Sequence, residues 1–335
     1  MKAAFIQEQG GPDQIEYGDL PTPIPGPGQA LIRIRAVSVN PIDTYIRGGI
    51  IPMPIPLPYV IGCDFAGEIV ELGPEVSGFS VGQRVWGSNQ GLMGRQGTFS
   101  EFAAIDSSWL NATPDGATDE EMAAVALVGI TAHLGLFSVG RLYPGQTVLI
   151  HGASGAVGSH VIQMTEATGA RPIAVTGDLA KEEGLRAIGA AEVLSYRDPN
   201  FAERLKACAP EGVDLWWETS REPDFDRIVP SMRQGGRIIL MAGRAARPEF
   251  PVGPFYVNNL SLHGFAMFNY KAENQRGAAR DIADWVGRGA FKPRIAKTLH
   301  LQEAAQAHRL QEDATLNASG AIAGKIVLTP GARVE

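Results

Sequence analysis

Three evenly spaced glycines are the feature of the sequence whose chemistry is easiest to infer. Gly152, Gly155 and Gly158 follow the apolar run 147–151 and precede a segment whose apolar residues recur at helical spacing. When a strand is followed by a tight turn and then by a helix, the backbone N–H groups at the beginning of the helix are free to hold a phosphate. The spacing therefore predicts a dinucleotide pyrophosphate site formed by Gly152, Ala153, Ser154, Gly155, Ala156, Val157 and Gly158.

The three glycines alone support that interpretation only weakly, because glycine accounts for 40 of the 335 residues. The segments after this turn add further support. Apolar runs alternate with segments of helical spacing, and the run at 236–243 is nearly all apolar, as in a strand covered on both faces. Such alternation predicts a doubly wound parallel sheet. The expected strands are 147–151, 171–177, 192–196, 212–218, 236–243 and 260–268, and the expected helices between them are 159–168, 181–188 and 201–207.

The remainder of the chain has a different pattern. Before residue 120, short apolar runs are separated by Pro and Gly clusters, which predicts an irregular β-barrel. A helix is expected at 118–137, with Thr118 as its N-cap and a second short helix at 131–139. Further helices are expected at 277–288 and 301–311. A terminal strand at 324–329 is placed with the first domain.

Length and composition limit the possible classes of protein. The chain has 335 residues, 44% of them hydrophobic and 19% charged, which suits two globular domains. A net charge of −7 and the lack of a Lys/Arg run argue against a nucleic acid or an anionic membrane as partner, and favour a small molecule. Two cysteines, no signal-peptide pattern and no apolar run of spanning length predict a cytoplasmic protein with reduced thiols.

Several segments, in order, resemble the medium-chain dehydrogenase/reductase superfamily and, within it, the zinc-free NADPH:quinone oxidoreductases that include zeta-crystallin. The resemblance implies a GroES-like catalytic domain at 1–122 and 269–335, a Rossmann NADP-binding domain at 123–268, and a homodimer formed through the strand at 260–268. The segments are Ser38–Gly48, Pro58–Gly67, Val81–Val85, Gly129–His133, Pro144–Gly158 and Ala323–Leu328.

Zinc-dependent members of the superfamily provide a test for a metal. Asn40 stands where they carry a Cys, and Leu127 and Val128 stand near another ligand position. Cys63 remains, but a catalytic zinc needs three protein ligands. We therefore expect a metal-free protein in which Cys63 is a small buried side chain.

The resemblance also indicates the cofactor. Thr176 stands where NAD-dependent relatives carry an acid that binds the ribose hydroxyls, and Lys181 and Tyr196 stand where quinone reductases bind the 2′-phosphate. This favours NADPH, although Asp178 departs from the family's Ser or Thr and would repel a phosphate. Gly177, Gly243 and Thr131 complete the expected cofactor contacts, and Thr131 is expected to touch the nicotinamide end.

The expected catalytic residues are Asn40, Asp43 and Tyr45, which we place in one short loop. Asn40 and Tyr45 can donate hydrogen bonds to a carbonyl oxygen that gains negative charge, and Asp43 would fix the loop, for instance through Arg47. Trp216 and Trp217 replace smaller residues of the relatives and could narrow the cofactor site. The resemblance implies hydride transfer from NADPH to a quinone or a similar activated carbonyl. Some relatives instead release a semiquinone by one-electron steps, and the sequence does not separate the two routes.

Two alternatives stay open. The first is an enone or enoyl C=C reductase, in which Tyr45 protonates the product. A thioester substrate is disfavoured because Ile50 occupies the position of a tyrosine in thioester reductases. The second alternative is a non-enzymatic NADPH-binding protein, as among the lens crystallins.

Overall fold

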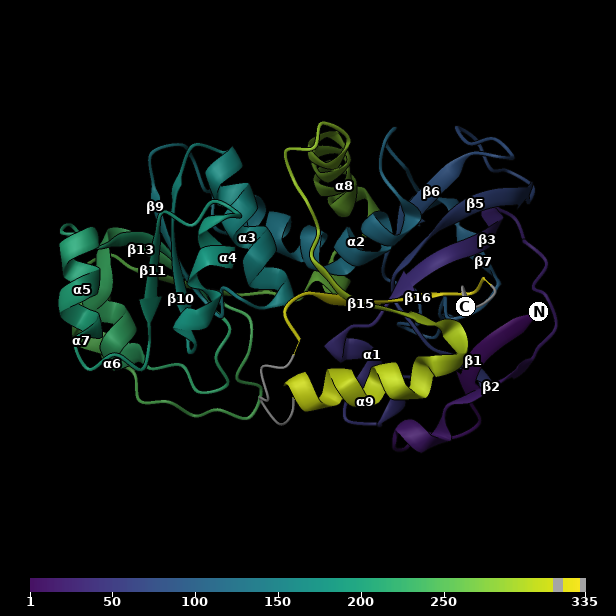
Figure 1. Ribbon diagram of the computed structural model, residues 1–335, viewed down its shortest axis with the longest axis horizontal. Coiled ribbons are helices and arrows are strands. Elements are labelled where there is room, and N and C mark those ends of the chain that lie inside the picture. Colours follow the sequence, from purple (N-terminus) through teal and green to yellow (C-terminus); the bar gives the residue numbers. More distant parts are fainter. Residues whose placement is uncertain (316–321, 332–335) are drawn as a thin grey trace. The chain divides into compact units, whose positions relative to one another are not determined.

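The computed structural model describes residues 1–315 and 322–331, which form two compact units (Figure 1). Unit 1 comprises Met1–Ile130 with the described residues from Tyr270 onward, and unit 2 comprises Thr131–Asn269. The predicted domains divide the chain at 122/123 and 268/269, close to these two positions.

Unit 2 contains the predicted doubly wound sheet. Its six strands lie in the order β11-β10-β9-β12-β13-β14, and every neighbouring pair is parallel. The carboxyl ends of the strands therefore share one edge of the sheet, with the reversal of strand order between β9 and β12. The strands are β9 (Thr147–His151), β10 (Arg171–Thr176), β11 (Glu192–Ser195), β12 (Val213–Glu218), β13 (Met232–Leu240) and β14 (Ser261–Gly264).

Helices cover both faces of this sheet, with α3 and α4 on one side and α5, α6 and α7 on the other (Figure 1). A buried apolar core that includes Leu149, Val175 and Ile238 fills one layer. The last strand, β14, is shorter than predicted because a 3-10 turn begins at Met267. The helices are α3 (Ala156–Ala167), α4 (Glu182–Arg186), α5 (Phe201–Cys208), α6 (Phe225–Ile228) and α7 (Val252–Val257), with 3-10 turns η4 (Leu179–Lys181), η5 (Val229–Ser231) and η6 (Met267–Asn269).

Unit 1 is built from short, mostly antiparallel strands. One sheet has the order β15-β16-β3-β5-β6-β8, with β7 also paired to β3, and a second has the order β2-β1-β4. The strands are β1 (Lys2–Ile6), β2 (Glu16–Asp19), β3 (Gln29–Ser38), β4 (Tyr59–Val60), β5 (Phe65–Leu72), β6 (Arg84–Gly87), β7 (Phe102–Asp106), β8 (Asn111–Ala112), β15 (Ile295–His300) and β16 (Lys325–Thr329).

The terminal strand joins the first sheet, as predicted. In the antiparallel pairing of β16 with β3, Val327 lies opposite Ser38 and Leu328 opposite Val37. This pairing brings the end of the described chain beside the segment that contains Asn40.

That segment is a helix, α1 (Pro41–Arg47), and the predicted loop is wrong. Pro41 occupies the first helical position, where its missing N–H costs no hydrogen bond. The Asp43 carboxylate then accepts the N–H of Asn40 at 2.8 Å and closes the first turn.

Unit 1 also contains α8 (Ala272–Gly287) and α9 (Ala304–Thr315), together with the 3-10 turns η1 (Pro12–Gln14), η2 (Ser107–Trp109) and η7 (Leu301–Glu303). Helix α9 packs on α1, and Glu312 of α9 pairs with the buried guanidinium of Arg47.

Helix α2 (Asp119–His133) continues into a π-helical turn, η3 (Leu134–Val139). Thr118 caps it as predicted, since its hydroxyl accepts the N–H of Glu121 at 3.1 Å. The segment Asp119–Val139 is long and apolar enough to cross a membrane, but 78% of its apolar window is buried in the protein, as in the core helix of a soluble protein.

Candidate functional site

The glycine turn between β9 and α3 leaves little room for side chains. Gly152 has a φ of +83°, and a Cβ there would lie 2.0 Å from the Thr219 hydroxyl oxygen. A Cβ on Gly158 would lie 2.3 Å from the Gly152 carbonyl oxygen, which is backbone and cannot move aside. Gly152 therefore suits a left-handed turn close to Thr219, and Gly158 allows the close packing of this turn against the start of α3.

The third glycine, Gly155, is the N-cap of α3 and is exposed. It offers no side chain to the N–H groups of the first helical turn, which an α-helix leaves without intrahelical partners. The Ser159 N–H donates to the Gly155 carbonyl at 3.0 Å, so the donors that remain in the first turn are those of Ala156, Val157 and Gly158. These donors and the macrodipole fit the pyrophosphate of a dinucleotide.

The end of β10 is the predicted position of the ribose. The Thr176 side chain is buried there, and its hydroxyl accepts the N–H of Asp178 at 3.2 Å, so it holds the turn. The Asp178 carboxylate, which was expected to repel a phosphate, accepts the N–H of Ala180 at 3.0 Å and caps η4. This contact does not test the expected repulsion. Lys181 is half-buried in the last position of η4.

Tyr196 directly follows β11 and reaches across to β10. A Cβ on Gly177 would lie 2.4 Å from the Tyr196 hydroxyl oxygen, so the absence of a side chain at Gly177 lets the phenol lie over the end of β10. The structure thus brings together Gly177 and Tyr196, as the resemblance implied. Gly243, beyond β13, has a φ of +85°, and Thr131 is buried in the last turn of α2.

The expected catalytic segment of unit 1 begins in a buried polar network centred on Asp64. Its carboxylate accepts hydrogen bonds from the Ser38 hydroxyl at 2.7 Å, the Asn40 amide at 2.8 Å and the Ser88 hydroxyl at 2.6 Å. Asp64 itself is 0% exposed. A buried carboxylate requires such donors, because an unpaired charge would be very costly.

Lys325 of β16 supplies the positive charge of this network. Its ammonium group lies 3.7 Å from the Asp64 carboxylate, and it donates to the Val39 carbonyl at 2.8 Å and to the side-chain oxygen of Asn40. Burial lowers the pKa of Lys325, and the neighbouring carboxylates oppose that shift. The residues 38–40 are therefore fixed by the last described strand.

Asp43 is a second carboxyl beside this single ammonium group. Burial raises its pKa to about 7, the hydrogen bond from the Cys63 thiol opposes that shift, and the negative charge of Asp64 adds to it. Its Oδ2 accepts the Asn40 N–H, and the Cys63 thiol is its weak side-chain donor. The predicted contact with Arg47 is wrong, because Arg47 pairs with Glu312.

Asn40 does not have the predicted geometry for a direct contact with a substrate. Its side chain is 0% exposed, and its amide nitrogen donates to Asp64 at 2.8 Å and more weakly to the Ser38 carbonyl at 3.4 Å. Its amide oxygen accepts from Lys325. Asn40 therefore holds the start of α1 in place, and Tyr45, half-buried on the same helix, is the predicted residue that retains surface exposure.

The residues around Cys63 do not fit a zinc ion. Cys63 is buried as predicted, and burial together with Asp43 raises the pKa of its thiol well above the usual value. Asn40 stands where zinc-dependent members carry a cysteine ligand. The Lys325 ammonium group already lies beside the Asp64 carboxylate, where it supplies the positive charge. Within residues 1–315 and 322–331, no three His, Cys, Asp or Glu side chains lie close enough to hold a metal.

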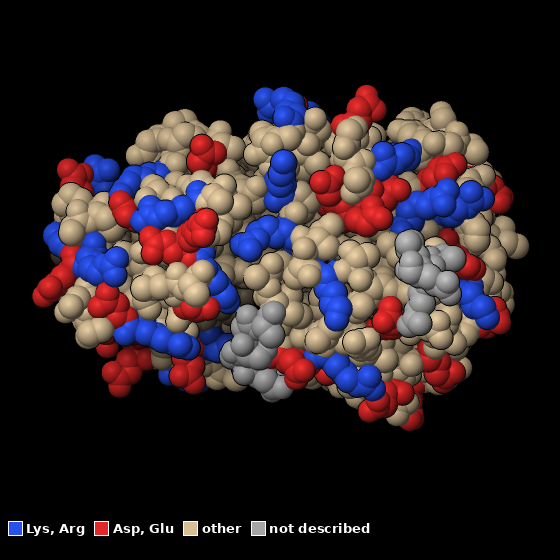
Figure 2. Space-filling model, in the orientation of Figure 1, with Lys and Arg blue, Asp and Glu red and all other residues tan. Residues whose placement is uncertain are grey.

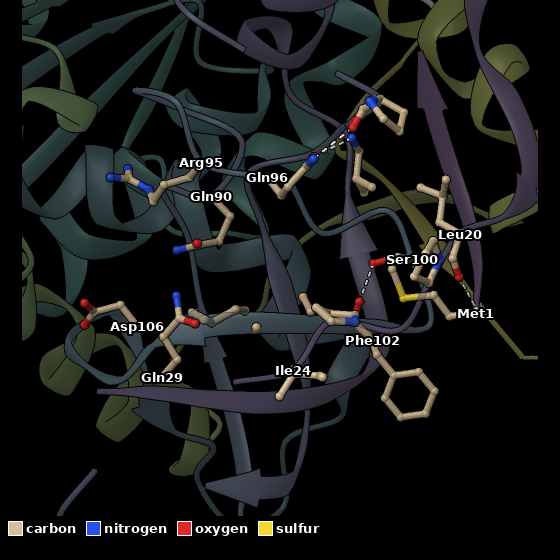
Figure 3. A pocket seen from close by; sticks show the side chains of 18 of the residues that line it. Met1, Leu20, Ile24, Gln29, Gln90, Arg95, Gln96, Ser100, Phe102 and Asp106 are labelled. Carbon is tan, nitrogen blue, oxygen red and sulfur yellow. Dashed lines mark hydrogen bonds between the residues drawn. The ribbon is translucent and has the colours of Figure 1, made fainter. Parts of the chain in front are cut away.

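A separate hollow of about 560 Å³ in unit 1 lies along β7 (Figure 3). Gln29, Gln90, Arg95 and Asp106 contribute polar groups to it, and Ile24 and Phe102 contribute apolar surface. Asn40, Asp43 and Tyr45 do not line this hollow, so it does not bear on their predicted role.

Trp216 and Trp217 belong to the core of unit 2 and do not narrow the cofactor site. Their exposed fractions are 2% and 0%. Trp217 packs on Gly135, where a Cβ would lie 2.3 Å from the indole ring. Trp216 donates to Glu218 at 2.9 Å, so this tryptophan supports a buried acid whose role the motifs did not reveal.

Comparison with known proteins agrees with this architecture. Residues 26–115 match the family "Alcohol dehydrogenase GroES-like domain", and residues 156–284 match the family "Zinc-binding dehydrogenase". These matches, with the parallel sheet and its glycine turn, define a member of the medium-chain dehydrogenase/reductase superfamily, the class that the sequence resembles.

The individual relatives narrow this class. A quinone oxidoreductase of Rattus norvegicus is 32% identical over 333 residues, covering 98% of this chain and 97% of the relative. A 2-haloacrylate reductase of Burkholderia sp is 30% identical, with 92% and 95% covered. A mycobacterial structure in complex with NADPH is 29% identical, covers 98% of this chain and 100% of its own, and has a TM-score of 0.84. The chain belongs to the quinone oxidoreductase family.

Proposed function

We propose that this oxidoreductase uses NADPH to reduce a quinone or a similar small activated carbonyl, without a metal. The observation that carries the proposal is the turn 152–158, whose glycines and free helix N–H groups fit a dinucleotide pyrophosphate. The similar mycobacterial protein binds NADPH, and the similar rat protein is a quinone oxidoreductase.

The cofactor residues divide by the part of the dinucleotide that they would hold. The turn residues Gly152, Ala153, Ser154, Gly155, Ala156, Val157 and Gly158 would hold the pyrophosphate. Gly177, Lys181 and Tyr196, beside Thr176, would hold the phosphorylated ribose. Thr131 would touch the nicotinamide end, and Gly243 would complete the cofactor contacts. When bound, NADPH supplies the hydride that reduces the acceptor.

The residues at the start of α1 and on it would position a hydrogen-bond donor for the carbonyl oxygen of the acceptor. Asn40 and Asp43 fix the first turn of the helix through hydrogen bonds to backbone and to Asp64. Tyr45 then presents a phenol from a fixed helix, and this group can donate a hydrogen bond or a proton to a carbonyl oxygen as negative charge develops.

The proposal is tested by following NADPH absorbance in the presence of a simple quinone, with NADH and an acceptor-free mixture as controls. We expect oxidation that depends on both quinone and protein, with NADPH preferred over NADH. Binding of NADPH without oxidation of any acceptor would favour the non-enzymatic alternative. A preference for NADH would overturn the cofactor assignment.

A second candidate function is reduction of an activated C=C bond, which the similarity to the Burkholderia 2-haloacrylate reductase supports. In this reaction Tyr45 would deliver the proton to the reduced carbon skeleton. Parallel assays with a quinone, an enone and a 2-haloacrylate, compared by kcat/KM, distinguish the two substrate classes.

The assembly and compartment are also proposals. Strand β14 lies at the edge of the sheet of unit 2, and Leu262 on it is 39% exposed, so we propose a homodimer that pairs two such edges. Light scattering after gel filtration would test this. The unpaired thiols of Cys63 and Cys208 suit the cytoplasm, which cell fractionation would test.

On the face drawn in Figure 2, basic and acidic side chains are interspersed over much of the surface, and several acidic ones gather right of the centre. With a net charge of −7, this face has no broad basic area of the kind that attracts nucleic acid or anionic lipid. The surface of this face is thus compatible with a small-molecule partner.

A further inference from the structure

A row of connected residues follows the carboxyl edge of the sheet in unit 2. Glu218 is the last residue of β12, His151 the last of β9, Gly177 follows β10, and Tyr196 follows β11. These four strands are neighbours in the order β11-β10-β9-β12. The row therefore lies at the edge where doubly wound sheets bind nucleotides.

Glu218 anchors the row from the interior. It is 1% exposed, and its carboxylate accepts from the Trp216 indole at 2.9 Å, from the Ser220 N–H at 2.6 Å and from His151 Nδ1 at 3.0 Å. Although burial alone would raise the pKa of Glu218, these donors hold it below its usual value. The acid is therefore ionised, and the proton of the bond lies on His151 Nδ1.

His151 transmits this fixed position to Tyr196. The Thr219 hydroxyl donates to the His151 carbonyl at 2.7 Å, and the imidazole is held by Glu218. The imidazole meets the Tyr196 ring edge to face, with 5.3 Å between centroids and 62° between planes. The phenol oxygen of Tyr196 consequently lies over Gly177, at the end of β10.

Packing alone does not explain a buried acid paired with a partly exposed histidine, because apolar side chains of similar size at these positions often give a protein of equal or higher stability. The arrangement is better explained by what it orients. In doubly wound folds the residue that ends the second strand, here β10, faces the ribose of the adenosine half.

We propose that Glu218 and His151 form a positioning pair that orients the Tyr196 hydroxyl toward the phosphorylated ribose, and so set the preference for the 2′-phosphate. This inference rests on the proposed function, because it assumes that a dinucleotide occupies the glycine turn. His151 is a positioning residue in this scheme, and the hydroxyl of Tyr196 makes the contact.

The test measures binding of two cofactor fragments, 2′,5′-ADP and 5′-AMP, to the full-length protein by calorimetry. We expect His151→Asn to weaken 2′,5′-ADP about tenfold and to leave 5′-AMP within about twofold, because the pair acts on the phosphate contact alone. Glu218→Gln, which keeps the shape of the acid, should have the same selective effect. His263→Asn on β14 is the matched control and should change neither affinity.

A double-mutant cycle separates positioning from direct contact. In a Tyr196→Phe protein, which lacks the hydroxyl, His151→Asn should cause no further loss of 2′,5′-ADP affinity. Additive losses would overturn the proposal, since His151 would then act on the phosphate without Tyr196. Equal losses for both fragments would overturn it as well.

Failure of the proposed function gives a different result. If the unaltered protein binds neither fragment, the dinucleotide site itself is wrong and the inference falls with it. If the unaltered protein prefers 2′,5′-ADP but His151→Asn and Glu218→Gln keep that preference, only the inference is overturned. Thermal unfolding of each variant identifies a protein that has failed to fold. If one of His151→Asn and Glu218→Gln fails to fold, the fragment affinities of the other variant test the inference.

Discussion

At the scale of single residues, the main feature of unit 1 is a buried cluster with two carboxyls and one ammonium group. Asp64 faces Lys325 and three neutral donors, whereas Asp43 has one backbone donor and the weakly donating Cys63 thiol. Asp43 is therefore the member that takes up a proton near neutral pH, and the other carboxyl keeps the ion pair.

This arrangement predicts a pH dependence of stability that Asp43→Asn removes. The folded-state pKa of about 7 lies above the usual value for Asp, so the contribution of Asp43 is complete below about pH 4 and is lost as the pH rises to about 7. Between about pH 5 and pH 8 the unaltered protein should lose on the order of 2 kcal/mol relative to the variant. Urea unfolding of both proteins across this range gives the difference, and parallel curves would contradict the shift.

A second prediction concerns Tyr45, which is half-buried on α1. Tyr45→Phe removes the phenol proton and should lower kcat for an enone on the order of 100-fold. The effect on a quinone should be less than about tenfold, because a quinone is easily reduced without a strong acid. Steady-state rates with both acceptors measure this, with Tyr143→Phe, at a side chain that is 58% exposed, as control. Equal rates for Tyr45→Phe and the unaltered protein would remove Tyr45 from the mechanism.

At the scale of elements, the turn from β9 to α3 shows how a backbone contact sets the geometry of a site. Gly158→Ala would put a Cβ 2.3 Å from the Gly152 carbonyl oxygen and 2.8 Å from the Ala153 Cα. Because both atoms are backbone, the start of α3 must move, and we expect a loss of roughly 1–3 kcal/mol in stability and at least about tenfold in NADPH affinity.

The control for this substitution is Gly253→Ala in α7 of the same unit, where a Cβ would meet no atom within 4 Å. That change should leave NADPH binding intact and stabilise the protein by up to roughly 1 kcal/mol, because alanine favours a helix. Denaturant unfolding and calorimetry measure both quantities. Unchanged cofactor affinity in Gly158→Ala would show that the close packing is not needed.

The elements of unit 2 could be predicted because their physical signals are local. Buried parallel strands have apolar interiors, as at 148–150 in β9, and the glycine turn has a fixed spacing. Helix α1 gave no such signal, because it has only seven residues and buries Asp43 and Arg47 along with its apolar side chains. Its burial pattern thus hides the usual apolar periodicity.

The site was predicted to a lesser extent, for a related reason. Asn40 and Asp43 could be selected from their segment, but their partners are far away in the sequence, at Asp64 and Lys325. A lysine in a terminal strand is normally a solvated residue, so only the three-dimensional structure reveals that Lys325 is buried. Glu218 was likewise hidden at the end of a strand of unit 2.

At the scale of the whole molecule, the last described strand, β16, supplies Lys325 to the buried polar network of Asn40 and Asp64, which lie in the first quarter of the chain. The ammonium group of Lys325 contacts the Val39 carbonyl, 286 residues earlier in the sequence, while β16 pairs with β3. The position of the predicted catalytic segment therefore depends on the last described strand.

Lys325→Met tests this dependence, because it keeps much of the side-chain volume and removes the charge. The buried Asp64 carboxylate would lose its only cationic partner among the described residues, and breaking such a buried pair typically costs roughly 3–5 kcal/mol. Lys297→Met, at an exposed position on the neighbouring β15, should change stability by less than about 0.5 kcal/mol. Adding Asp64→Asn to Lys325→Met should restore part of the loss, since no uncompensated charge remains. Denaturant unfolding of the four proteins measures these differences. Equal midpoints for Lys325→Met and Lys297→Met would mean that β16 does not hold the segment of Asn40 in place through this charge.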